Sequence, residues 1–262
     1  MKKKFGQHFL NNQKTIQKII DAAEINHNSL VFEVGPGNGS LSKEIIKKNP
    51  KDFVAVEIDK SLNEDLLKIF QKTDYKLIFN DALKINEKSF FLKDAILISN
   101  LPYNISLALL IKWIYQIERK TWYKKMILMF QKEVADRIIS YENSKKFGRI
   151  SILSGAFFKI KKIIDVKKNE FTPMPKVDST VLLFEPLKKN KIKFKDIKTL
   201  ELITTQFFSS RRKKLKKKIL KFFSCDEIKK YSLEQFFDCR AENLNKETFY
   251  KLTKIYNSRN YI

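Results

Sequence analysis

The sequence predicts an α/β fold in which a mostly parallel sheet carries helices on both faces, followed by a small all-α C-terminal domain. From Leu30 onward, short runs of β-forming residues alternate with amphipathic segments, which is typical of βαβ units. Three of the six glycines, Gly35, Gly37 and Gly39, follow the first of these runs. Beyond about Lys188 the β-forming runs end, and helical spacing with many lysines takes their place.

The first half of the chain supplies most of the predicted sheet. Before the first strand, Ile16, Ile19, Ile20 and Ala23 recur at helical spacing and predict a helix with one buried face. Predicted strands then cover residues 30–34, 53–58, 76–80, 95–99 and 126–130. Predicted helices follow these strands at residues 40–48, 61–70, 105–115 and 133–139. Strands connected through helices in this way are expected to lie parallel.

Past Gly148 the pattern changes. Residues 160–166 and 176–186 predict two further strands, which flank the loop FTPMPK at residues 171–176. We expect this loop to close the sheet. Helical spacing then marks residues 197–208, 215–223 and 246–256. The domain boundary is placed near residues 187–191, which gives domains of residues 1–187 and 188–262.

Composition limits the classes of function. The chain carries 53 Lys and Arg against 29 Asp and Glu, a net charge of +24, which predicts a polyanionic partner, although an AT-rich coding bias also enriches lysine. Cys225 and Cys239 have no Cys or His at metal-ligand spacing around them, so neither a disulfide framework nor a metal site is predicted. The basic start lacks the apolar core of a signal peptide, and the most apolar stretch is interrupted by polar residues. We therefore expect a soluble, cytoplasmic protein without membrane contact.

The glycine-rich turn predicts a nucleoside site. Gly35 and Gly37 let the backbone turn tightly beside a ligand, and a helix starting near Ser40 would direct its free N–H groups toward it. Glu57 ends the next strand 22 residues after Gly35, close to the spacing at which an acid binds ribose hydroxyls, and Asp81 ends the strand after that. An ordinary strand-to-helix turn with capping carboxylates is the alternative. The absence of G-x-G-x-x-G and of a P-loop disfavours nicotinamide and nucleoside-triphosphate cofactors.

A second motif, Asn100-Leu101-Pro102-Tyr103, follows the strand at 95–99. Pro102 biases Leu101 toward an extended backbone, so the Asn100 amide and the Leu101 carbonyl can point into one cleft as two acceptors. Two acceptors holding the protons of an adenine N6 amine would direct its lone pair toward a methyl donor without a strong base. Tyr103 offers an aromatic face for a flipped-out base. A strand-to-helix loop with a helix cap at Asn104 or Ser106 is the alternative.

Several segments together resemble a known family. The turn E-x-G-x-G-x-G, with Glu33 before the first glycine, resembles the S-adenosylmethionine site of class I methyltransferases, which have a Rossmann-like fold. NLPY resembles the signature of rRNA adenine N6 methyltransferases. Further matching segments are KKKFGQHFLNN, QKEVADRI, ENSKKFGRIS, FTPMPKVDS, FFSSRRKKLKKKIL and RAENLNKETFYKL. Over nearly its whole length the chain thus resembles the KsgA-type small-subunit rRNA adenine dimethyltransferases.

This resemblance implies S-adenosylmethionine as cofactor and dimethylation of two adjacent adenosines in a hairpin near the 3′ end of 16S rRNA, and it leaves open a role in small-subunit assembly. Matching positions assign the cofactor to His8, Leu10, Gly35, Gly37, Glu57, Asp81 and Asn100. The catalytic set is Asn100, Leu101, Pro102, Tyr103 and Phe171. In it Phe171 and Tyr103 sandwich the target base, with an apolar loop anchor as the alternative for Phe171. The chain departs from the family pattern at His8 and Lys217, where relatives have Asn.

The tail carries the densest positive charge. Between Ser209 and Lys221 there are eight basic residues and no acid. Apolar residues at helical spacing predict a helix docked by one face with its cations outward. We expect the cluster to contact rRNA phosphates through Arg211, Arg212, Lys213, Lys214 and Lys217, with plain solvated charge as the alternative. The partner is then the small ribosomal subunit or its precursor, bound by a monomer.

Two rival functions remain at this stage. An Erm-like methyltransferase acting on large-subunit rRNA shares the glycine turn and the N-x-P-Y motif, although the RRK and RAENL segments of the tail argue against it. A non-catalytic assembly or nucleic-acid-binding factor could keep the fold without the reaction. The intact Gly35, Glu57, Asp81 and NLPY argue against that second interpretation.

Overall fold

The computed structural model describes residues 7–117 and 121–258. The chain divides into two compact units, Met1–Ala135 with Lys159–Pro186, and Asp136–Phe158 with Leu187–Ile262. The second unit includes residues 136–158, which the sequence analysis grouped with residues 1–187. The division of function between residues 1–187 and 188–262 stays a prediction.

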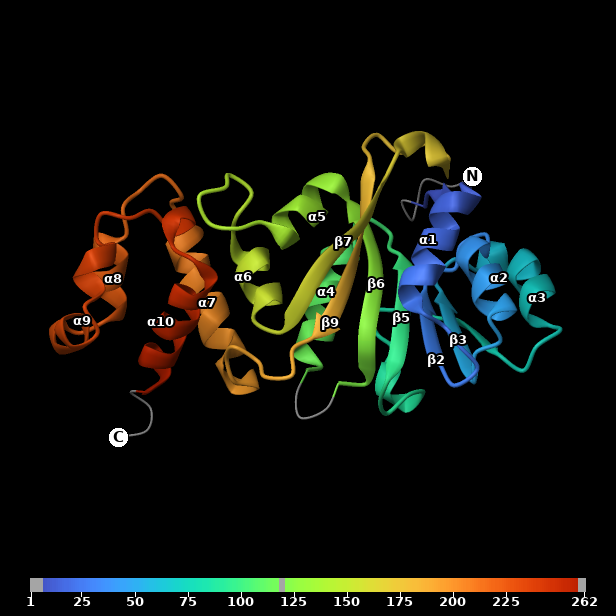
Figure 1. Cartoon of the computed structure of the whole chain (residues 1–262), viewed down its shortest axis with the longest axis horizontal. Coiled ribbons are helices and arrows are strands. Elements are labelled where there is room, and N and C mark those ends of the chain that lie inside the picture. The colour runs from blue at the N-terminus through green and yellow to red at the C-terminus, as the bar shows by residue number, and fades with distance from the viewer. Residues whose placement is uncertain (1–6, 118–120, 259–262) are drawn as a thin grey trace. The chain divides into compact units, whose positions relative to one another are not determined.

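The first unit is built on a seven-stranded sheet of order β4-β3-β2-β5-β6-β9-β7 (Figure 1). Its strands are β2 (Leu30–Val34), β3 (Asp52–Glu57), β4 (Lys76–Phe79), β5 (Ala95–Asn100), β6 (Tyr123–Gln131), β7 (Phe158–Val166) and β9 (Ser179–Pro186). The first five strands are parallel, and β9 pairs antiparallel with β6. This arrangement confirms the predicted mostly parallel sheet, and each predicted strand lies within three residues of an observed one.

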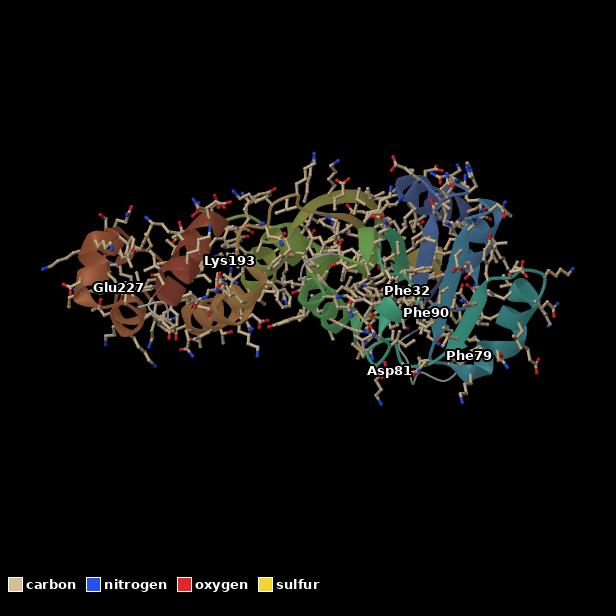
Figure 2. The ribbon with its side chains drawn as sticks, turned by 90° about the horizontal axis from the view of Figure 1, so that it is seen from below. Phe32, Phe79, Asp81, Phe90, Lys193 and Glu227 are labelled. Atoms are coloured by element: carbon tan, nitrogen blue, oxygen red, sulfur yellow. The ribbon has the colours of Figure 1, made fainter. Side chains whose placement is uncertain are left out.

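Helices cover both faces of this sheet. They are α1 (Gln13–Ala23), α2 (Ser40–Lys47), α3 (Asn63–Phe70) and α4 (Ser106–Tyr115), whereas α5 (Lys132–Ile139) is divided between the two units at Ala135. One core cluster joins Ile16 and Ile20 of α1 and Ile45 of α2 to sheet residues such as Phe53 and Ile98. On the opposite face Phe32 packs against Phe90 and Trp122, with ring centroids 6.1 and 5.4 Å away (Figure 2). Because side chains alternate along a strand, the nearly continuous apolar strands supply both cores.

A second, two-stranded sheet ties the start of the chain to the FTPMPK loop. β1 (Phe9–Leu10) pairs antiparallel with β8 (Phe171–Thr172), and the Asn11 N–H donates to the Glu170 carbonyl at 2.8 Å. The two strands that flank the loop, β7 and β9, do lie side by side at one end of the large sheet, but the loop at 171–176 itself adds no strand to that sheet. In the large sheet β9 pairs with β6. The start of the loop pairs instead with the segment before α1, residues 7–12, which we call the N-terminal arm.

The second unit is helical, with α6 (Arg149–Gly155), α7 (Ile197–Phe208), α8 (Lys216–Phe222), α9 (Cys225–Lys230) and α10 (Lys246–Ser258). Helix α6 packs with α7 and α10, and the buried Tyr250 hydroxyl donates to the Ile152 carbonyl at 2.8 Å. This contact explains why residues 136–158 belong to this unit. Among the described helices, none combines the length and apolar character needed to cross a membrane.

The basic segment of the second unit departs from its predicted form. Residues 209–214 form a turn between α7 and α8, whereas the sequence predicted one docked helix across them. Leu215 after the turn is fully buried, and its N–H donates to the Cys239 carbonyl at 2.9 Å. Leu215 is anchored in this way directly before α8 begins at Lys216, which helical periodicity alone does not reveal.

Candidate active site

A cavity of about 160 Å³ lies at the carboxyl ends of β2, β3 and β5. Strand β2 has β3 on one side and β5 on the other, so this is the point where strand order reverses and where open α/β sheets bind ligands. The cavity is lined by all but one of the predicted cofactor and catalytic residues: His8, Leu10, Gly35, Gly37, Glu57, Asp81, Asn100, Leu101, Pro102 and Tyr103. Gln7, Phe9 and Leu83 also line it, although sequence reasoning did not assign them to the site, and so does Glu33, which the sequence analysis named only as part of the glycine-turn motif.

The backbone conformation of the turn requires glycine at three positions. Gly35, Gly37 and Gly39 have φ of +70°, +59° and +77°, a region that side chains other than glycine rarely adopt. A Cβ at Gly37 would lie 2.8 Å from the Phe9 ring, so the N-terminal arm closes directly over the turn. Helix α2 begins at Ser40 immediately afterwards, with its first N–H groups beside the cavity.

Glu57 supports the turn from the end of β3. Its Oε2 accepts from the Gly37 N–H at 3.1 Å, and its Oε1 accepts from the N–H groups of Ile58 and Asp59 at 2.9 Å each. Burial raises the pKa of Glu57, and these backbone hydrogen bonds oppose the shift. A carboxylate has about four acceptor positions, so Oε2 retains one for a ligand hydroxyl. The remaining acceptor position on Oε2 is the group that the predicted contact with a ribose hydroxyl needs.

Glu33 lies at the floor of the same cavity, near the end of β2. It is 1% exposed, and its Oε2 accepts from the Ser42 hydroxyl of α2 at 2.6 Å. Burial raises the pKa of Glu33 to about 8, with the hydrogen bond from Ser42 opposing the shift and the nearby Glu57 adding to it. At neutral pH Glu33 is therefore mostly protonated, and it places a neutral group beneath the glycine turn. The sequence signal for it was its position two residues before Gly35.

Asp81 is half-buried in the turn after β4, near Phe79 (Figure 2). Its Oδ1 accepts from the Leu83 N–H at 2.9 Å, and its backbone N–H donates to the Asn80 side chain at 2.8 Å. The side chain is thus fixed by its own turn. Asp81 and Leu83 both line the cavity, where a carboxylate beside an apolar side chain suits an adenine ring and its exocyclic amine.

The amide of Asn100 is oriented by the N-terminal arm. Its Nδ2 donates to the His8 carbonyl at 2.9 Å. Asn100 lines the cavity, and among the described residues nothing donates to its Oδ1, so this oxygen is available as an acceptor. The sequence identified Asn100 but not the His8 carbonyl that selects which end of the amide is free.

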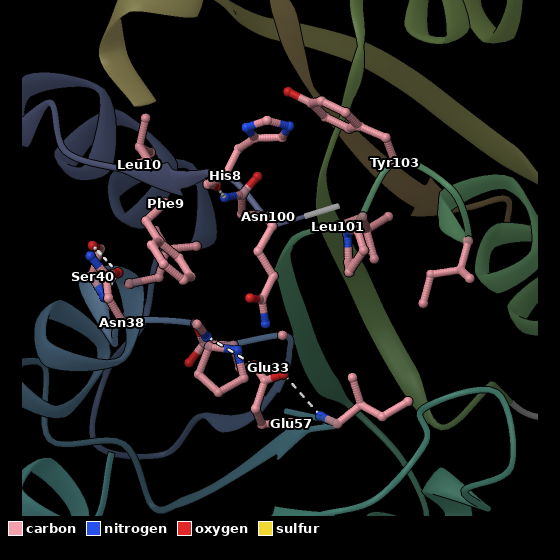
Figure 3. A pocket seen from close by; sticks show the side chains of 18 of the residues that line it. His8, Phe9, Leu10, Glu33, Asn38, Ser40, Glu57, Asn100, Leu101 and Tyr103 are labelled. Atoms are coloured by element: carbon pink, nitrogen blue, oxygen red, sulfur yellow. Dashed lines mark hydrogen bonds between the residues drawn. The ribbon is translucent and has the colours of Figure 1, made fainter. Parts of the chain in front are cut away.

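Tyr103 is held at its hydroxyl and beside its ring. Its hydroxyl shares a 2.6 Å hydrogen bond with the Ser179 hydroxyl of β9, and burial raises the pKa of its phenol. The His8 ring stacks beside it, with centroids 5.4 Å apart and an interplanar angle of 30° (Figure 3). His8 Nδ1 lies 2.7 Å from the Pro173 carbonyl. The imidazole therefore already covers part of the aromatic surface predicted to receive a base.

Phe171 is the predicted site residue that the structure places outside the cavity lining. It is 3% exposed and belongs to the core cluster that contains Leu10, Ile16 and Val166. The pairing of β8 with β1 sets Phe171 opposite Leu10 and turns its ring into this core. In this structure Phe171 acts as an apolar anchor of the loop.

The predicted RNA-contacting residues differ in what they touch. The Arg211 guanidinium donates to Glu242 at 2.6 Å and to the carbonyls of Ser144 and Phe147 at 3.2 and 2.8 Å. Lys214 pairs with the exposed Asp238 at 2.7 Å. The side chains of Arg212, Lys213 and Lys217 are exposed. Arg211 therefore holds two loops of its own unit together, while the exposed cations face solvent.

This fold and this site define a class I methyltransferase that uses S-adenosylmethionine. A glycine turn, an acid at the end of β3, a second acid after β4 and an asparagine acceptor after β5 surround one cavity. A family model described as ribosomal RNA adenine dimethylase matches residues 1–258, so the chain belongs to this family. The resemblance found in the sequence is confirmed, and the chain is an rRNA adenine dimethyltransferase.

Individual relatives agree with this family. The chain is 44% identical over 257 residues to ribosomal RNA small subunit methyltransferase A of Pelagibacter ubique (strain HTCC1062), covering 97% of this chain and 96% of the relative. It is 38% identical to the protein of the same description from Neorickettsia sennetsu, covering 97% of both chains. The crystal structure of a dimethyladenosine transferase from Plasmodium falciparum superposes with a TM-score of 0.77 at 25% identity, covering 97% of this chain and 98% of that one.

Proposed function

We propose that the chain dimethylates the N6 amines of two adjacent adenosines in a hairpin near the 3′ end of 16S rRNA. The observation that carries the proposal is the near-complete match to small-subunit methyltransferases, together with an intact NLPY motif at the cavity. The crystal structure of the 23S rRNA methyltransferase ErmE has a TM-score of 0.69 but only 19% identity, so that likeness supports the shared fold alone. We further propose that the protein acts as a cytoplasmic monomer on the small subunit or its precursor.

The residues around Asn100 would position the target amine. Asn100 Oδ1 and the Leu101 carbonyl accept hydrogen bonds from the N–H groups of the amine and turn the nitrogen lone pair toward the cofactor side of the cavity. Tyr103, anchored by Ser179, offers its ring for stacking of the base. Bound S-adenosylmethionine supplies an electrophilic sulfonium methyl group. Because an N6 amine becomes acidic as it is methylated, water reached through the cavity mouth suffices to take the proton.

The opposite part of the cavity fits the cofactor. Glu57 retains an acceptor position for a ribose hydroxyl, and Asp81 offers a carboxylate to the adenine amine. Gly35 and Gly37 leave the room that a side chain would fill, and His8 and Leu10 close the cavity from the arm. These contacts suit the donor and acceptor pattern of an adenosine.

We assign rRNA contacts in the second unit to Arg212, Lys213 and Lys217, whose exposed ammonium and guanidinium groups suit phosphates. Arg211 contributes indirectly, since its hydrogen bonds shape the turn that carries Arg212 and Lys213. Lys214 can exchange its exposed Asp238 partner for a phosphate at small cost, because such surface pairs are weak.

One assay tests the proposed function. Purified protein and methyl-labelled S-adenosylmethionine are incubated with small and large ribosomal subunits from a strain that lacks the modification. We expect dimethyladenosine only in small-subunit rRNA, at two adjacent positions of the 3′ hairpin. Label in large-subunit rRNA would favour the Erm-like alternative, and the absence of label from both would favour a non-catalytic binding factor.

A further inference from the structure

A buried polar cluster lies outside the cavity, between α4 and the segment that follows β4. At its centre Glu87 is 1% exposed. Its Oε1 accepts from Lys112 Nζ at 2.8 Å and from the Trp113 indole at 2.9 Å, and its Oε2 accepts from Gln116 at 2.8 Å. Burying a carboxylate costs free energy of folding unless hydrogen-bond and ion-pair partners surround it. Glu87 has three such partners, which offset this cost.

Lys112 extends this cluster to the cofactor side. Besides Glu87, its Nζ donates to the carbonyls of Ala82 and Ile85 at 2.7 and 2.5 Å, so all three ammonium donors are used. The N–H groups of Lys84 and Ile85 donate to the Asp81 carbonyl. Lys112 therefore binds the tight turn 81–85 at two carbonyls, those of Ala82 and Ile85. Asp81 and Leu83 of the same turn line the cavity.

The same helix begins at the methyl-transfer motif. Helix α4 starts at Ser106, whose hydroxyl donates to the Tyr103 carbonyl at 3.1 Å, and the Ile105 N–H donates to the Pro102 carbonyl. Lys112 lies on this helix and reaches the turn 81–85 from it. Helix α4 thus contacts both parts of the site. Its N-terminus binds the NLPY loop, and the side chain of Lys112 binds the Asp81 turn.

We propose that Lys112, held by Glu87, is a positioning residue that presets the Asp81–Ile85 turn for the adenosine end of S-adenosylmethionine. The inference rests on the proposed role of Asp81 in cofactor binding. Lys112 is not among the residues that line the cavity, and its donors are taken by the backbone of the turn and by Glu87. Its effect is therefore expected in cofactor affinity and not in the chemical step.

The test measures binding of S-adenosylhomocysteine and of methylthioadenosine by calorimetry, with no RNA present. For Lys112→Met we expect both Kd values to rise on the order of tenfold, the loss that a few misplaced hydrogen bonds produce. Lys112→Arg keeps a cation with several donors and should recover part of the affinity. Lys84→Met is the matched control, because Lys84 lies in the same turn but is exposed, and it should bind as the native protein does.

Steady-state methylation separates positioning from catalysis. For Lys112→Met, KM for S-adenosylmethionine should rise with the Kd, while kcat at saturating cofactor stays within about twofold. If Lys112→Met does not fold, as judged by thermal melting, Glu87→Gln replaces it, because the amide keeps the shape but weakens the hold on Lys112. Native affinity in a folded variant, or a fall in kcat with unchanged Kd, would overturn the inference.

The two proposals fail in different ways. Calorimetry without RNA reports on Lys112 even if the protein methylates a different RNA, so a wrong rRNA assignment leaves this test intact. Asp81→Ala is measured alongside. If Asp81→Ala binds methylthioadenosine like the native protein, the proposed role of Asp81 fails, and the positioning role of Lys112 fails with it.

Discussion

The cavity of the first unit and the turn 209–214 of the second unit place their ionisable side chains in opposite environments. Around the cavity Glu33 and Glu57 are nearly buried, have raised pKa values and are fixed by hydrogen bonds to Ser42 and to backbone N–H groups. In the turn Arg212 and Lys213 are exposed. The first region depends on the placement of single atoms, whereas the second depends on a sum of charges that salt screens.

This contrast predicts different responses to mutation. In the cavity a single substitution should lower the rate of methyl transfer strongly, and a change in salt concentration should not restore it. In the basic turn each substitution should lower RNA affinity by a small, additive and salt-dependent amount. Arg211 is the exception, because its hydrogen bonds stabilise the fold.

The largest effect is expected for Asn100→Ala. Removing its amide deletes an acceptor at the target amine, and methyl transfer at saturating cofactor should fall by about 10²–10³. Binding of rRNA, measured by filter retention, should stay within about twofold of native. Asn28→Ala, at an exposed site remote from the cavity, is the control. Loss of RNA binding together with activity would erase the contrast between the two regions.

The buried acid should make stability depend on pH. Glu33 has a folded pKa of about 8, above its unfolded value of 4.5, so the folded protein binds its extra proton and loses stability as pH rises between these two values. In Glu33→Gln the loss should vanish, so the native Tm should fall relative to the variant by about 5 °C or more between about pH 5 and about pH 9. Parallel Tm curves would show that Glu33 is ionised throughout.

Arg211→Ala should act on the fold more than on RNA. It leaves the carbonyls of Ser144 and Phe147 and the carboxylate of Glu242 without this donor, and we expect a loss of about 1–2 kcal/mol in the free energy of unfolding. Urea denaturation measures it. Arg212→Ala, one residue on and exposed, should leave the free energy of unfolding unchanged within about 0.5 kcal/mol.

The smallest effect is expected for the exposed cations. The double variant Arg212→Ala, Lys213→Ala should lower the slope of log affinity against log salt by about 1.5–2, while kcat is retained. The control replaces two exposed lysines of α10, Lys251 and Lys254, with Ala and removes the same charge. An equal change in both double variants would mean that overall charge, and not this turn, sets RNA affinity.

Local patterns were sufficient for much of the molecule. The strands that carry the site, the glycine turn, Glu57, Asp81 and the NLPY motif were all identified from short segments, because backbone preference and side-chain alternation act within a few residues. The predicted helix at residues 215–223 is confirmed as α8, but the prediction that residues 209–214 belong to the same helix was wrong, because they form a turn. The apolar spacing was compatible with a helix, but the buried Leu215 pairs with the distant Cys239.

The sequence by itself determined the class of fold, the family and the chemical groups of the site. Only the tertiary structure decided which atoms of those groups are free. The Asn100 amide is oriented by the His8 carbonyl 92 residues away, Phe171 is drawn into the core by pairing with the N-terminal arm, and Arg211 is used by loops of its own unit. These contacts join segments far apart in the chain, so the local sequence around each residue does not specify them.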